Sequence, residues 1–274
     1  MVRQFFHERG VIEADVPALS PYASVDAYID LIETKEGGFL HSSPEYALKR
    51  LICAGAGDIY YLGHAFRKEE KSPIHNSEFT MIEWYRLNTD EESFLQEVIE
   101  LISLFLGPIR VEKLDFEEAY LRFAEPIGAE VDTSTWTKDD CFYYQWAKSV
   151  EPKLGRGCLT LLTNFPKEHA VLAKTHLVND EEKARRYEIY YEGIELGNGF
   201  DELSDPVEHR RRFIEANEIR RSQGKSAYPI DELFLQALHE GSLPNQTFGI
   251  AVGFDRLLML GQKKGELKDV LALL

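Results

Sequence analysis

Apolar and polar positions along the first half of the chain predict a sheet hairpin and the helix that follows it. Residues 58–67 are largely apolar, residues 70–76 form a polar loop, and residues 78–86 return as a second strand. Two such runs joined by a polar loop predict a long antiparallel hairpin. Apolar side chains at positions 94–105 then recur at helical spacing and stop at Gly107. This pattern predicts a helix that packs on the sheet.

A shorter helix is predicted before the hairpin, after a short strand at residues 38–41. Ser42 or Ser43, followed by Pro44 and Glu45, forms a typical helix start. A hydroxyl caps the first turn, proline suits the first helical position, and an acid lies near the positive end of the helix dipole. The helix is expected to turn four apolar side chains inward: Tyr46, Leu48, Leu51 and Ile52.

The second half of the chain predicts further short strands and helices. Strands are expected at 159–163, 187–191 and 194–202, a helix at 206–221, and a strand running through a glycine into a helix at 250–260. Residues 114–156 predict helices joined by loops. Because antiparallel strands and segregated helices characterise α+β proteins, we expect that fold class. No linker or repeat divides the sequence, so residues 1–274 are expected to form a single domain.

Composition narrows the possible partners. The chain has 274 residues, with 31 Lys and Arg against 47 Asp and Glu, and a formal net charge of −16. This balance disfavours a nucleic-acid-coating surface, because such affinity comes largely from basic residues that neutralise phosphates. The arginines at 210–212 and 220–221 alternate with glutamates, which favours a salt-bridged helix face over a basic patch.

Other sequence features bear on the compartment. No apolar run reaches the length of a membrane helix, and the first residues lack the apolar core of a signal peptide. The three cysteines show no CxxC spacing, which indicates neither a disulfide framework nor a zinc site. We therefore expect a cytoplasmic protein without a membrane partner.

The hairpin carries the first candidate binding residues. Alternate side chains of a strand share a face, which places Glu83 on a mostly apolar face with Phe79 and Tyr85. A carboxylate there is costly unless it is paired, and its natural partner would be a bound cation. Arg67 and Glu69 are expected to share a face and to offer a guanidinium for phosphate and an acceptor for an amine. The alternative is a surface hairpin with an Arg–Glu ion pair.

The second candidate group lies on the two strands expected near residue 190. Asn198, Phe200 and Glu202 have the same parity, so an amide, an aromatic ring and a carboxylate would line one face. Glu188 lies across the turn from Glu195, and two carboxylates so placed could hold a magnesium ion bound to phosphates. A solvated acidic pair is the alternative.

Two further residues are candidates for contacts with a nucleotide. Arg256 begins an apolar helix, where it is poorly placed for solvent and well placed to stack on a planar base. His75, in the hairpin loop, could reach a phosphate, although a lone loop histidine is more often only solvated. The glycines before Arg256 match neither a P-loop nor a dinucleotide-binding fingerprint.

The order and spacing of these segments resemble the catalytic core of the class II aminoacyl-tRNA synthetases of the lysyl type. Three signatures of that class occur in order: a helix and strand ending at Pro17, the hairpin FRKEE to HNSEFTMIEWY, and GIAVGFDR ending at Arg256. Two stretches resemble additions of the lysine enzymes, SPEYALKRL and GIELGNGFDEL. The resemblance covers nearly the whole chain. It implies a mainly antiparallel sheet flanked by helices, with ATP and Mg²⁺ as cofactors.

The first signature begins at the first residue, so no anticodon-binding OB domain is expected. The chain therefore resembles the truncated relatives that attach lysine or β-lysine to a lysine side chain of translation elongation factor P. The resemblance implies an AMP-forming ligase, elongation factor P as protein substrate and no stable nucleic-acid partner. It also implies a homodimer that pairs through the first signature, where Val11, Val16 and Leu19 would otherwise be partly exposed.

The resemblance implies a role for each candidate residue in the amino-acid pocket. Glu45 would bind the α- or β-amino group, and Glu83 and Glu202 would bind the ε-ammonium together with Tyr85. A diamino substrate brings two positive charges that need buried carboxylates, which agrees with this assignment. The remaining substrate-binding residues would be Asn198 and Phe200.

The resemblance also implies the ATP site. Arg67 and Arg256 would be the catalytic residues, with Arg67 on the substrate carboxylate and the α-phosphate. Phe79 and Arg256 would sandwich adenine, and Glu69 would accept from its amino group. His75 would face the β- and γ-phosphates. The metal ligands would be Glu188 and Glu195.

The sequence departs from the family pattern at three places. Ser-Pro-Ile precedes His75 where an arginine is usual, and Lys68 stands where asparagine is usual. Gly197 is typical of the synthetases, whereas the ligases often have alanine there, so the choice between α-lysine and β-lysine stays open. Two other functions also stay open: the charging of tRNA and a non-catalytic regulator resembling a synthetase.

Overall fold

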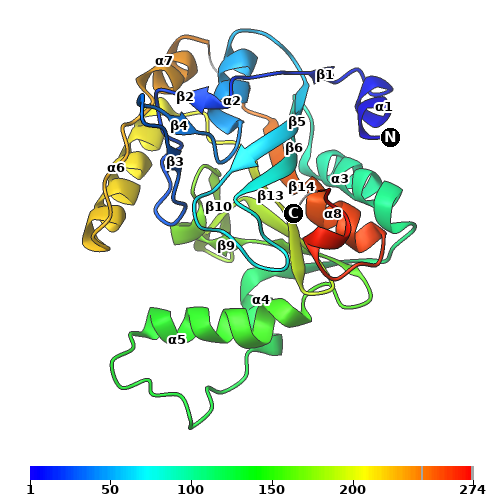
Figure 1. Cartoon of the computed structure of the whole chain (residues 1–274), viewed down its shortest axis with the longest axis vertical. Coiled ribbons are helices and arrows are strands. Elements are labelled where there is room, and N and C mark those ends of the chain that lie inside the picture. Colours follow the sequence, from blue (N-terminus) through cyan, green and yellow to red (C-terminus); the bar gives the residue numbers. More distant parts are fainter. Residues whose placement is uncertain (242, 273–274) are drawn as a thin grey trace. The chain divides into compact units, whose positions relative to one another are not determined.

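The computed structural model describes residues 1–241 and 243–272, and the chain divides into two compact units. The first unit comprises residues 1–107 together with the described residues from 201 onward, and the second comprises residues 108–200. Each unit consists of mainly antiparallel strands with helices beside them, which confirms the α+β class (Figure 1). The single domain expected from the sequence stays a prediction.

Four strands form the main sheet of the first unit. Across the sheet they are β1 (Ile12–Glu13), β5 (Ile59–Phe66), β6 (Glu78–Leu87) and β14 (Thr247–Gly253). β5 and β6 form the predicted antiparallel hairpin, β14 pairs antiparallel with β6, and β1 runs parallel to β5. A small sheet beside it contains β2 (Leu19–Ser20), β4 (Phe39–Leu40) and β3 (Ile32–Glu33).

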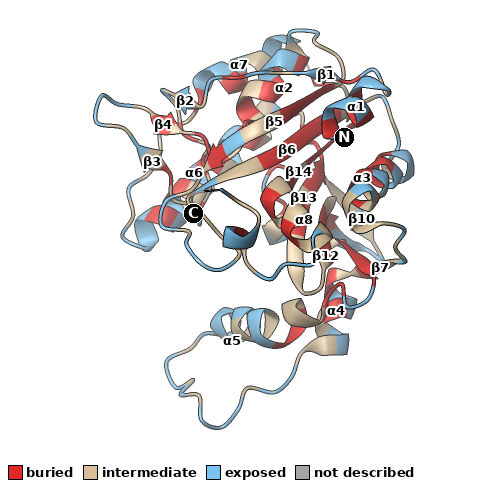
Figure 2. Cartoon of the chain, turned by 45° about the vertical axis from the view of Figure 1, so that its right-hand side comes forward, coloured by how far each residue is buried: buried red, intermediate tan, exposed pale blue. Residues whose placement is uncertain are grey.

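Helices complete the first unit. They are α1 (Val2–His7), α2 (Glu45–Cys53), α3 (Glu91–Leu106), α6 (Pro206–Ser222), α7 (Glu232–Gly241), α8 (Phe254–Gly261) and the 3₁₀ turn η4 (Leu267–Asp269). The Asp90 side chain caps α3 by accepting from the Ser93 amide at 2.8 Å. Phe94 of α3 lies 6.1 Å from Trp84 and 5.7 Å from Phe248, ring centre to ring centre. The predicted packing of this helix on the sheet is therefore confirmed, and Figure 2 shows the buried stretches of β5, β6 and β14.

Helix α2 differs from its prediction in one side chain. Tyr46, Leu48 and Ile52 are buried as expected, but Leu51 is 37% exposed. Lys49 is fully buried instead. Positions 45, 48, 49 and 52 form one helical stripe, so residue 49 lies on the buried face whatever its polarity.

The exposure of the apolar side chains after α1 also differs from the prediction. Val11 and Val16 are buried within this chain, at 4% and 8% exposure. Leu19 is 51% exposed and Ile12 is 59% exposed. The apolar surface near the first signature is therefore smaller than the sequence indicated, and Ile12 and Leu19 contribute to it.

The second unit has its own strands. Across its main sheet they are β13 (Ile194–Asp201), β12 (Arg186–Tyr191), β8 (Leu159–Thr163) and β7 (Val111–Asp115). β12 pairs antiparallel with both neighbours, and β7 runs parallel to β8. The sequence predicted β8, β12 and β13 but not β7. A three-stranded sheet that it also missed contains β10 (Thr175–Val178), β11 (Glu181–Ala184) and β9 (Phe165–Pro166).

Helical segments of the second unit surround an aromatic core. They are α4 (Phe116–Phe123), α5 (Lys138–Gln145), the π-helical turn η1 (Trp146–Val150) and the 3₁₀ turns η2 (Glu151–Lys153) and η3 (Lys167–His169). The helices and loops expected over residues 114–156 are thus confirmed. Phe116 and Phe165 lie in this core, with Phe142 and Trp146 packed against it.

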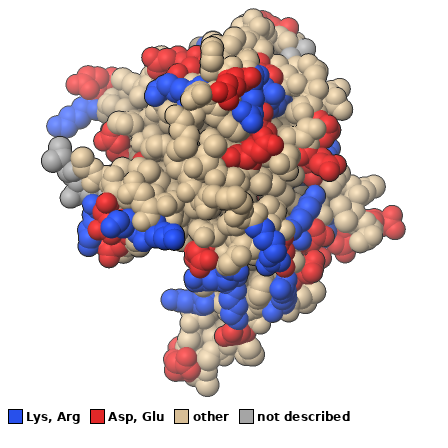
Figure 3. All heavy atoms as spheres, turned by 90° about the vertical axis from the view of Figure 1, so that its right-hand side faces the viewer, with Lys and Arg blue, Asp and Glu red and all other residues tan. Residues whose placement is uncertain are grey.

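Charged side chains pair extensively on the surface. In α6, Arg211 pairs with Glu208 and Glu215, and Arg212 pairs with Glu208. The salt-bridged helix face that the sequence favoured is therefore confirmed. Figure 3 shows acidic and basic side chains interspersed over one face of the molecule. Within residues 1–241 and 243–272, no helix combines the length and apolar character needed to cross a membrane.

Candidate active site

Three carboxylates predicted to bind amines converge in the first unit. Glu45 lies at the start of α2, Glu83 in the middle of β6, and Glu202 directly after β13. Glu83 and Glu202 are 2% and 1% exposed. The Glu202 amide donates to the Thr247 carbonyl at 2.9 Å, which fixes that residue beside β14.

Glu83 is held by two hydroxyls. Ser43 Oγ donates to its Oε2 at 2.6 Å, and Tyr85 Oη donates to its Oε1 at 2.7 Å. The Ser43 hydroxyl also accepts from the Glu45 amide at 3.0 Å, but Pro44 is the N-cap of α2 and no side chain caps the helix, so the expected hydroxyl cap is wrong. The predicted association of Glu83 with Tyr85 is present, and each of its carboxylate oxygens has a donor.

Lys49 lies between the other two carboxylates. Its Nζ is 2.5 Å from Glu45 Oε1 and 2.5 Å from Glu202 Oε2. The contact with Glu45 is a hydrogen bond, whereas the contact with Glu202 is an ion pair outside hydrogen-bond geometry. Because both partners are needed to offset the cost of burying an ammonium group, the cluster acts as a unit.

A glycine makes room for this cluster. Gly249 of β14 lies opposite Tyr85 of β6. A Cβ atom at Gly249 would lie 2.3 Å from Glu202 Oε1 and 2.4 Å from Tyr85 Cε1. Only glycine therefore allows the strand to approach the buried carboxylate and the ring so closely.

Burial changes the protonation of the cluster. Burial, together with the Glu45 charge, raises the pKa of Glu83 to about 7. Burial also raises the pKa of Glu202 despite the Lys49 ammonium beside it. Burial opposes the charged form of Lys49, but the carboxylates of Glu202 and Glu45 outweigh it and raise its pKa. The cluster thus combines a stable ammonium with carboxylates that resist ionisation while no further cation is present.

The residues predicted to bind ATP lie at the far end of the hairpin. The Arg67 guanidinium lies 5.1 Å from the centre of the Phe79 ring and 3.8 Å from Glu70. Its Nε atom is buried without a hydrogen-bond partner among the described residues. A buried guanidinium nitrogen without an acceptor is costly, so this atom is available for an anionic ligand.

Glu69 differs from its prediction. Strand β5 ends at Phe66, so the alternation of faces does not extend to Glu69. Its backbone has a φ of 62° and its side chain is 81% exposed, beside Lys68 Nζ at 3.5 Å. The prediction that Arg67 and Glu69 share a strand face is therefore wrong, because Glu69 lies in a turn after the end of the strand.

Arg256 lies against the hairpin loop. Its Nη2 is 2.5 Å from His75 Nε2, and its Nε donates to the Ile74 carbonyl at 3.2 Å. Burial and then the charge of Arg256 lower the pKa of His75, so this imidazole is neutral at neutral pH. The Leu267 amide donates to the Pro73 carbonyl at 2.8 Å and joins the same loop to the segment after α8. Arg256 and His75, two predicted nucleotide contacts, are thus brought together.

The predicted metal ligands lie in the second unit. Glu188 of β12 is 7% exposed, pairs with Arg186 and accepts from Tyr190 Oη at 2.7 Å. Glu195 of β13 lies opposite Tyr190 in the sheet. Burial, followed by the charges of Glu188 and Glu195, raises the pKa of Tyr190. Tyr190 is thus bonded through its hydroxyl to Glu188 and is the cross-strand partner of Glu195.

The remaining substrate candidates lie on the same pair of strands. Asn198 is opposite Glu188 and accepts from Arg186 Nε at 3.1 Å. Phe200 is opposite Arg186 and is 8% exposed. No group of three or more His, Cys, Asp or Glu side chains suited to a metal occurs in the described part of the chain. Two carboxylates that need further oxygen ligands are typical of Mg²⁺ bound together with phosphates.

Comparisons with known proteins show the family of the chain. The family model for class II tRNA synthetases of the aspartate, lysine and asparagine types matches residues 1–273. The chain belongs to this family. Within the class II synthetases, similar proteins are named elongation factor P–(R)-β-lysine ligase. They include those of Pectobacterium atrosepticum, 37% identical, and of Edwardsiella ictaluri and Photorhabdus laumondii, both 36% identical. Each match covers 99% of this chain and 90% of the relative.

Sequence reasoning missed one residue of the buried carboxylate cluster. Lys49 was not among the candidates, because lysine on a helix is normally assigned to solvent. Two signals were available. Glu45 and Lys49 have the i,i+4 spacing of an ion pair, and Lys49 falls on the stripe of Leu48 and Ile52.

Proposed function

We propose that this chain activates lysine or β-lysine with ATP as an aminoacyl-adenylate and transfers it to a lysine side chain of translation elongation factor P. The observation that carries the proposal is the buried cluster of Glu45, Glu83 and Glu202 around Lys49. Membership of the class II synthetases supports ATP-dependent activation, and the names of the similar proteins support the acceptor and favour (R)-β-lysine.

The charge of the cluster matches a diamino acid. When ionised, the three carboxylates and the Lys49 ammonium leave two negative charges, which the two ammonium groups of lysine or β-lysine would neutralise. Glu45 would bind the α- or β-amino group, because its side chain is 17% exposed and therefore accessible. Glu83 and Glu202, with Tyr85, would bind the ε-ammonium deeper inside. Asn198 and Phe200 would be the further substrate contacts.

The nucleotide would bind at the end of the hairpin. Arg67 has a buried Nε without an acceptor, which suits the substrate carboxylate and the α-phosphate. Phe79 and Arg256 would hold adenine, which requires Arg256 to exchange its contact with His75 for one with the base. His75 would then face the outer phosphates, and Glu69 would accept from the adenine amino group.

Glu188 and Glu195 would hold Mg²⁺ through hard oxygen ligands, and the ion would screen charge on the phosphates. The ion pair of Arg186 with Glu188 argues against this assignment, because it offers the same carboxylate another cation. The magnesium site therefore requires Arg186 to share or release Glu188.

The proposed chemistry needs no covalent enzyme intermediate. The substrate carboxylate attacks the α-phosphorus of ATP and pyrophosphate leaves, which gives the adenylate. The neutral amine of the acceptor lysine then attacks the adenylate carbonyl, AMP leaves, and an amide forms as the nitrogen loses a proton. Positioning by Arg67 and charge stabilisation at the α-phosphate would supply most of the rate enhancement.

The assembly and compartment are proposed on separate grounds. A homodimer through the first signature is expected of this family, and the exposed Ile12 and Leu19 would be covered in it. A reducing, cytoplasmic setting agrees with three free cysteines at positions 53, 141 and 158. Sedimentation at micromolar concentration would test the dimer: a species of 31.5 kDa alone would contradict it.

The decisive experiment compares acceptors and donors directly. Elongation factor P and lysine tRNA are each incubated with the enzyme and ATP, with either L-lysine or (R)-β-lysine. We expect intact-mass analysis to detect one added lysyl group on elongation factor P, and (R)-β-lysine to react faster. Efficient charging of tRNA without modification of the protein would instead support the synthetase alternative. ATP binding without pyrophosphate exchange would support the non-catalytic one.

A further inference from the structure

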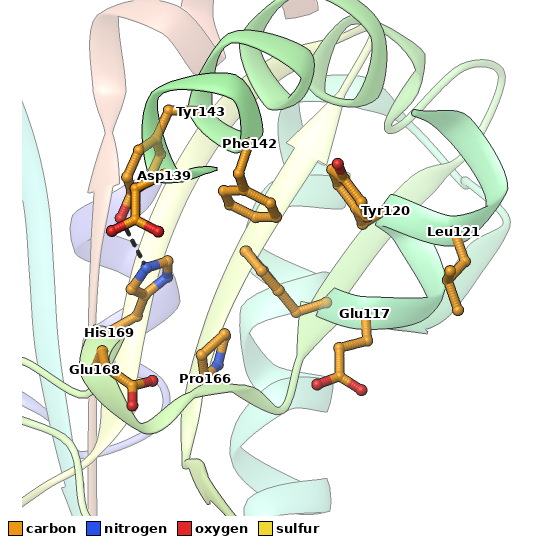
Figure 4. Close-up of a pocket in the computed structure, with 10 residues that line it drawn as sticks. Glu117, Tyr120, Leu121, Asp139, Phe142, Tyr143, Pro166, Glu168 and His169 are labelled. Atoms are coloured by element: carbon orange, nitrogen blue, oxygen red, sulfur yellow. Dashed lines mark hydrogen bonds between the residues drawn. The ribbon is translucent and has the colours of Figure 1, made fainter. Parts of the chain in front are cut away.

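The second unit contains a pocket that the proposed reaction does not use. Its volume is about 490 Å³, within the usual range of ligand sites. Helices α4 and α5 form one part of its wall, and the segment from β9 to η3 forms the other (Figure 4). The residues that line it include Phe116, Tyr120, Asp139, Phe142, Glu168 and His169.

Aromatic rings form a rigid floor. Phe116 stacks on Trp146 with 4.2 Å between ring centres and meets the edge of His169 at 5.5 Å. Phe142 lies 4.8 Å from Tyr120 and 5.9 Å from Phe116. Because each ring is held by another, the floor cannot collapse into the pocket, and its ring faces favour a cation.

Two carboxylates at this pocket have no partner of their own. Glu117 has a cationic partner, because it shares Lys183 with Glu181. The side-chain carboxylates of Asp139, in the first turn of α5, and of Glu168 form no hydrogen bond or ion pair among residues 1–241 and 243–272. In Figure 4 both carboxylates lie on the side of the pocket where Tyr143 and His169 meet.

His169 does not offset these charges. Tyr143 Oη lies 3.1 Å from His169 Nε2. Burial, followed by the charge of Arg186, lowers the pKa of His169, so its ring is neutral at neutral pH. An aromatic floor with two acids therefore carries net negative charge, which disfavours phosphates and other anions and favours a cation.

We propose that this pocket binds a basic side chain of the protein acceptor, with its apolar stem on the aromatic floor and its cationic head against Asp139 and Glu168. The proposal rests on the proposed function for the identity of the partner. Leu121 at the mouth is 83% exposed and Tyr143 is 50% exposed, so the pocket has an apolar rim for surrounding protein surface. A free small cation would leave this rim uncovered.

The test separates acceptor recognition from lysine activation. Asp139→Asn and Glu168→Gln are made singly and together, and Glu118→Gln serves as the control, because Glu118 is exposed on α4 but does not line the pocket. We expect the double variant to lower kcat/KM for elongation factor P by about fivefold to thirtyfold, and to weaken its salt dependence. Lysine-dependent pyrophosphate exchange should equal that of the wild type, as should transfer by Glu118→Gln.

Charge-retaining variants exclude a structural explanation. Asp139→Glu and Glu168→Asp preserve both carboxylates and should retain most of the transfer activity. If the neutral double variant transfers lysine at the wild-type rate, the pocket does not bind the acceptor. If pyrophosphate exchange falls in parallel with transfer, its role is structural and the proposal is also wrong. If the wild-type enzyme does not modify elongation factor P, the proposed function itself is wrong. This result differs from the two outcomes above, which concern the variants.

Discussion

Replacement of Lys49 by methionine tests whether the acidic cluster depends on its internal ammonium. The side chain is fully buried and lies 2.5 Å from both Glu45 and Glu202. Methionine has a similar length and no charge, so the change removes the cation with little change in packing. Removing one partner of a buried ion pair typically costs about 3–5 kcal/mol, because an uncompensated charge stays buried. We expect a loss of this size in the free energy of unfolding at pH 8.

The loss should depend on pH in a defined direction. Without Lys49, the carboxyl of Glu202 can escape the cost by taking up a proton, and burial already raises its pKa. A group whose pKa is higher in the folded state contributes stability below that value and loses it as pH rises. Lys49→Met should therefore be less destabilising at pH 6 than at pH 8, by about 1 kcal/mol or more.

Urea denaturation at both pH values, followed by tryptophan fluorescence, measures this difference. The double variant Lys49→Met/Glu202→Gln completes a thermodynamic cycle and should recover part of the stability, because no unpaired carboxylate remains at position 202. Equal stability of Lys49→Met and the wild type at pH 8 would refute the charge argument. A loss that is the same at pH 6 and pH 8, and that the double variant does not reduce, would assign the effect to packing.

Three further predictions concern the same pocket. Glu83→Gln and Glu202→Gln should each reduce lysine-dependent pyrophosphate exchange by an amount equivalent to about 2–4 kcal/mol. ATP binding, measured by calorimetry, should be unchanged. If both variants retain exchange, the pocket assignment is wrong. The KM for lysine should fall as pH rises from 6 to 8, because the raised pKa of Glu83, about 7, leaves its carboxyl partly protonated at the lower pH. A KM that does not change with pH would argue against a role of Glu83 in binding the ammonium group. Gly249→Ala should lower exchange at least tenfold and destabilise the fold by about 1–3 kcal/mol, because the added Cβ would lie 2.3 Å from Glu202 Oε1. Unchanged kinetics would show that the strand can move away.

Segments with strong periodicity were predictable from the sequence. The β5–β6 hairpin and helix α3 formed as expected, because apolar side chains on one face must be buried against another element. The small sheet of β9, β10 and β11 was not predictable. Its strands include EEKA and THLV, in which exposed charged or polar positions hide the alternation that marks a half-buried strand.

The site was predictable where a strand fixed the side chains and less so where a turn did. Glu83 and Tyr85 share a face of β6 and contact each other, as their spacing indicated. Glu69 follows the end of β5, and a left-handed turn directs it to solvent. The helical spacing of Lys49 with Glu45 and Leu48 indicated its buried face, but its second partner, Glu202, is 153 positions later in the chain and could not be predicted from the sequence.

A lysine inside a pocket for a diamino acid has a physical consequence for specificity. Burial raises the pKa values of Glu83 and Glu202, and the Lys49 ammonium beside Glu202 and Glu45 favours the ionised form of these carboxylates. If the proposed pocket is correct, a substrate with one ammonium group would leave one negative charge in it and a substrate with two would leave none, so we expect the cluster to select by charge. α-Lysine and β-lysine carry the same two ammonium groups. Under the proposed assignment, discrimination between them would come from the position of the α- or β-amino group relative to Glu45, the partly exposed member of the cluster, and not from the buried pair of Glu83 and Glu202.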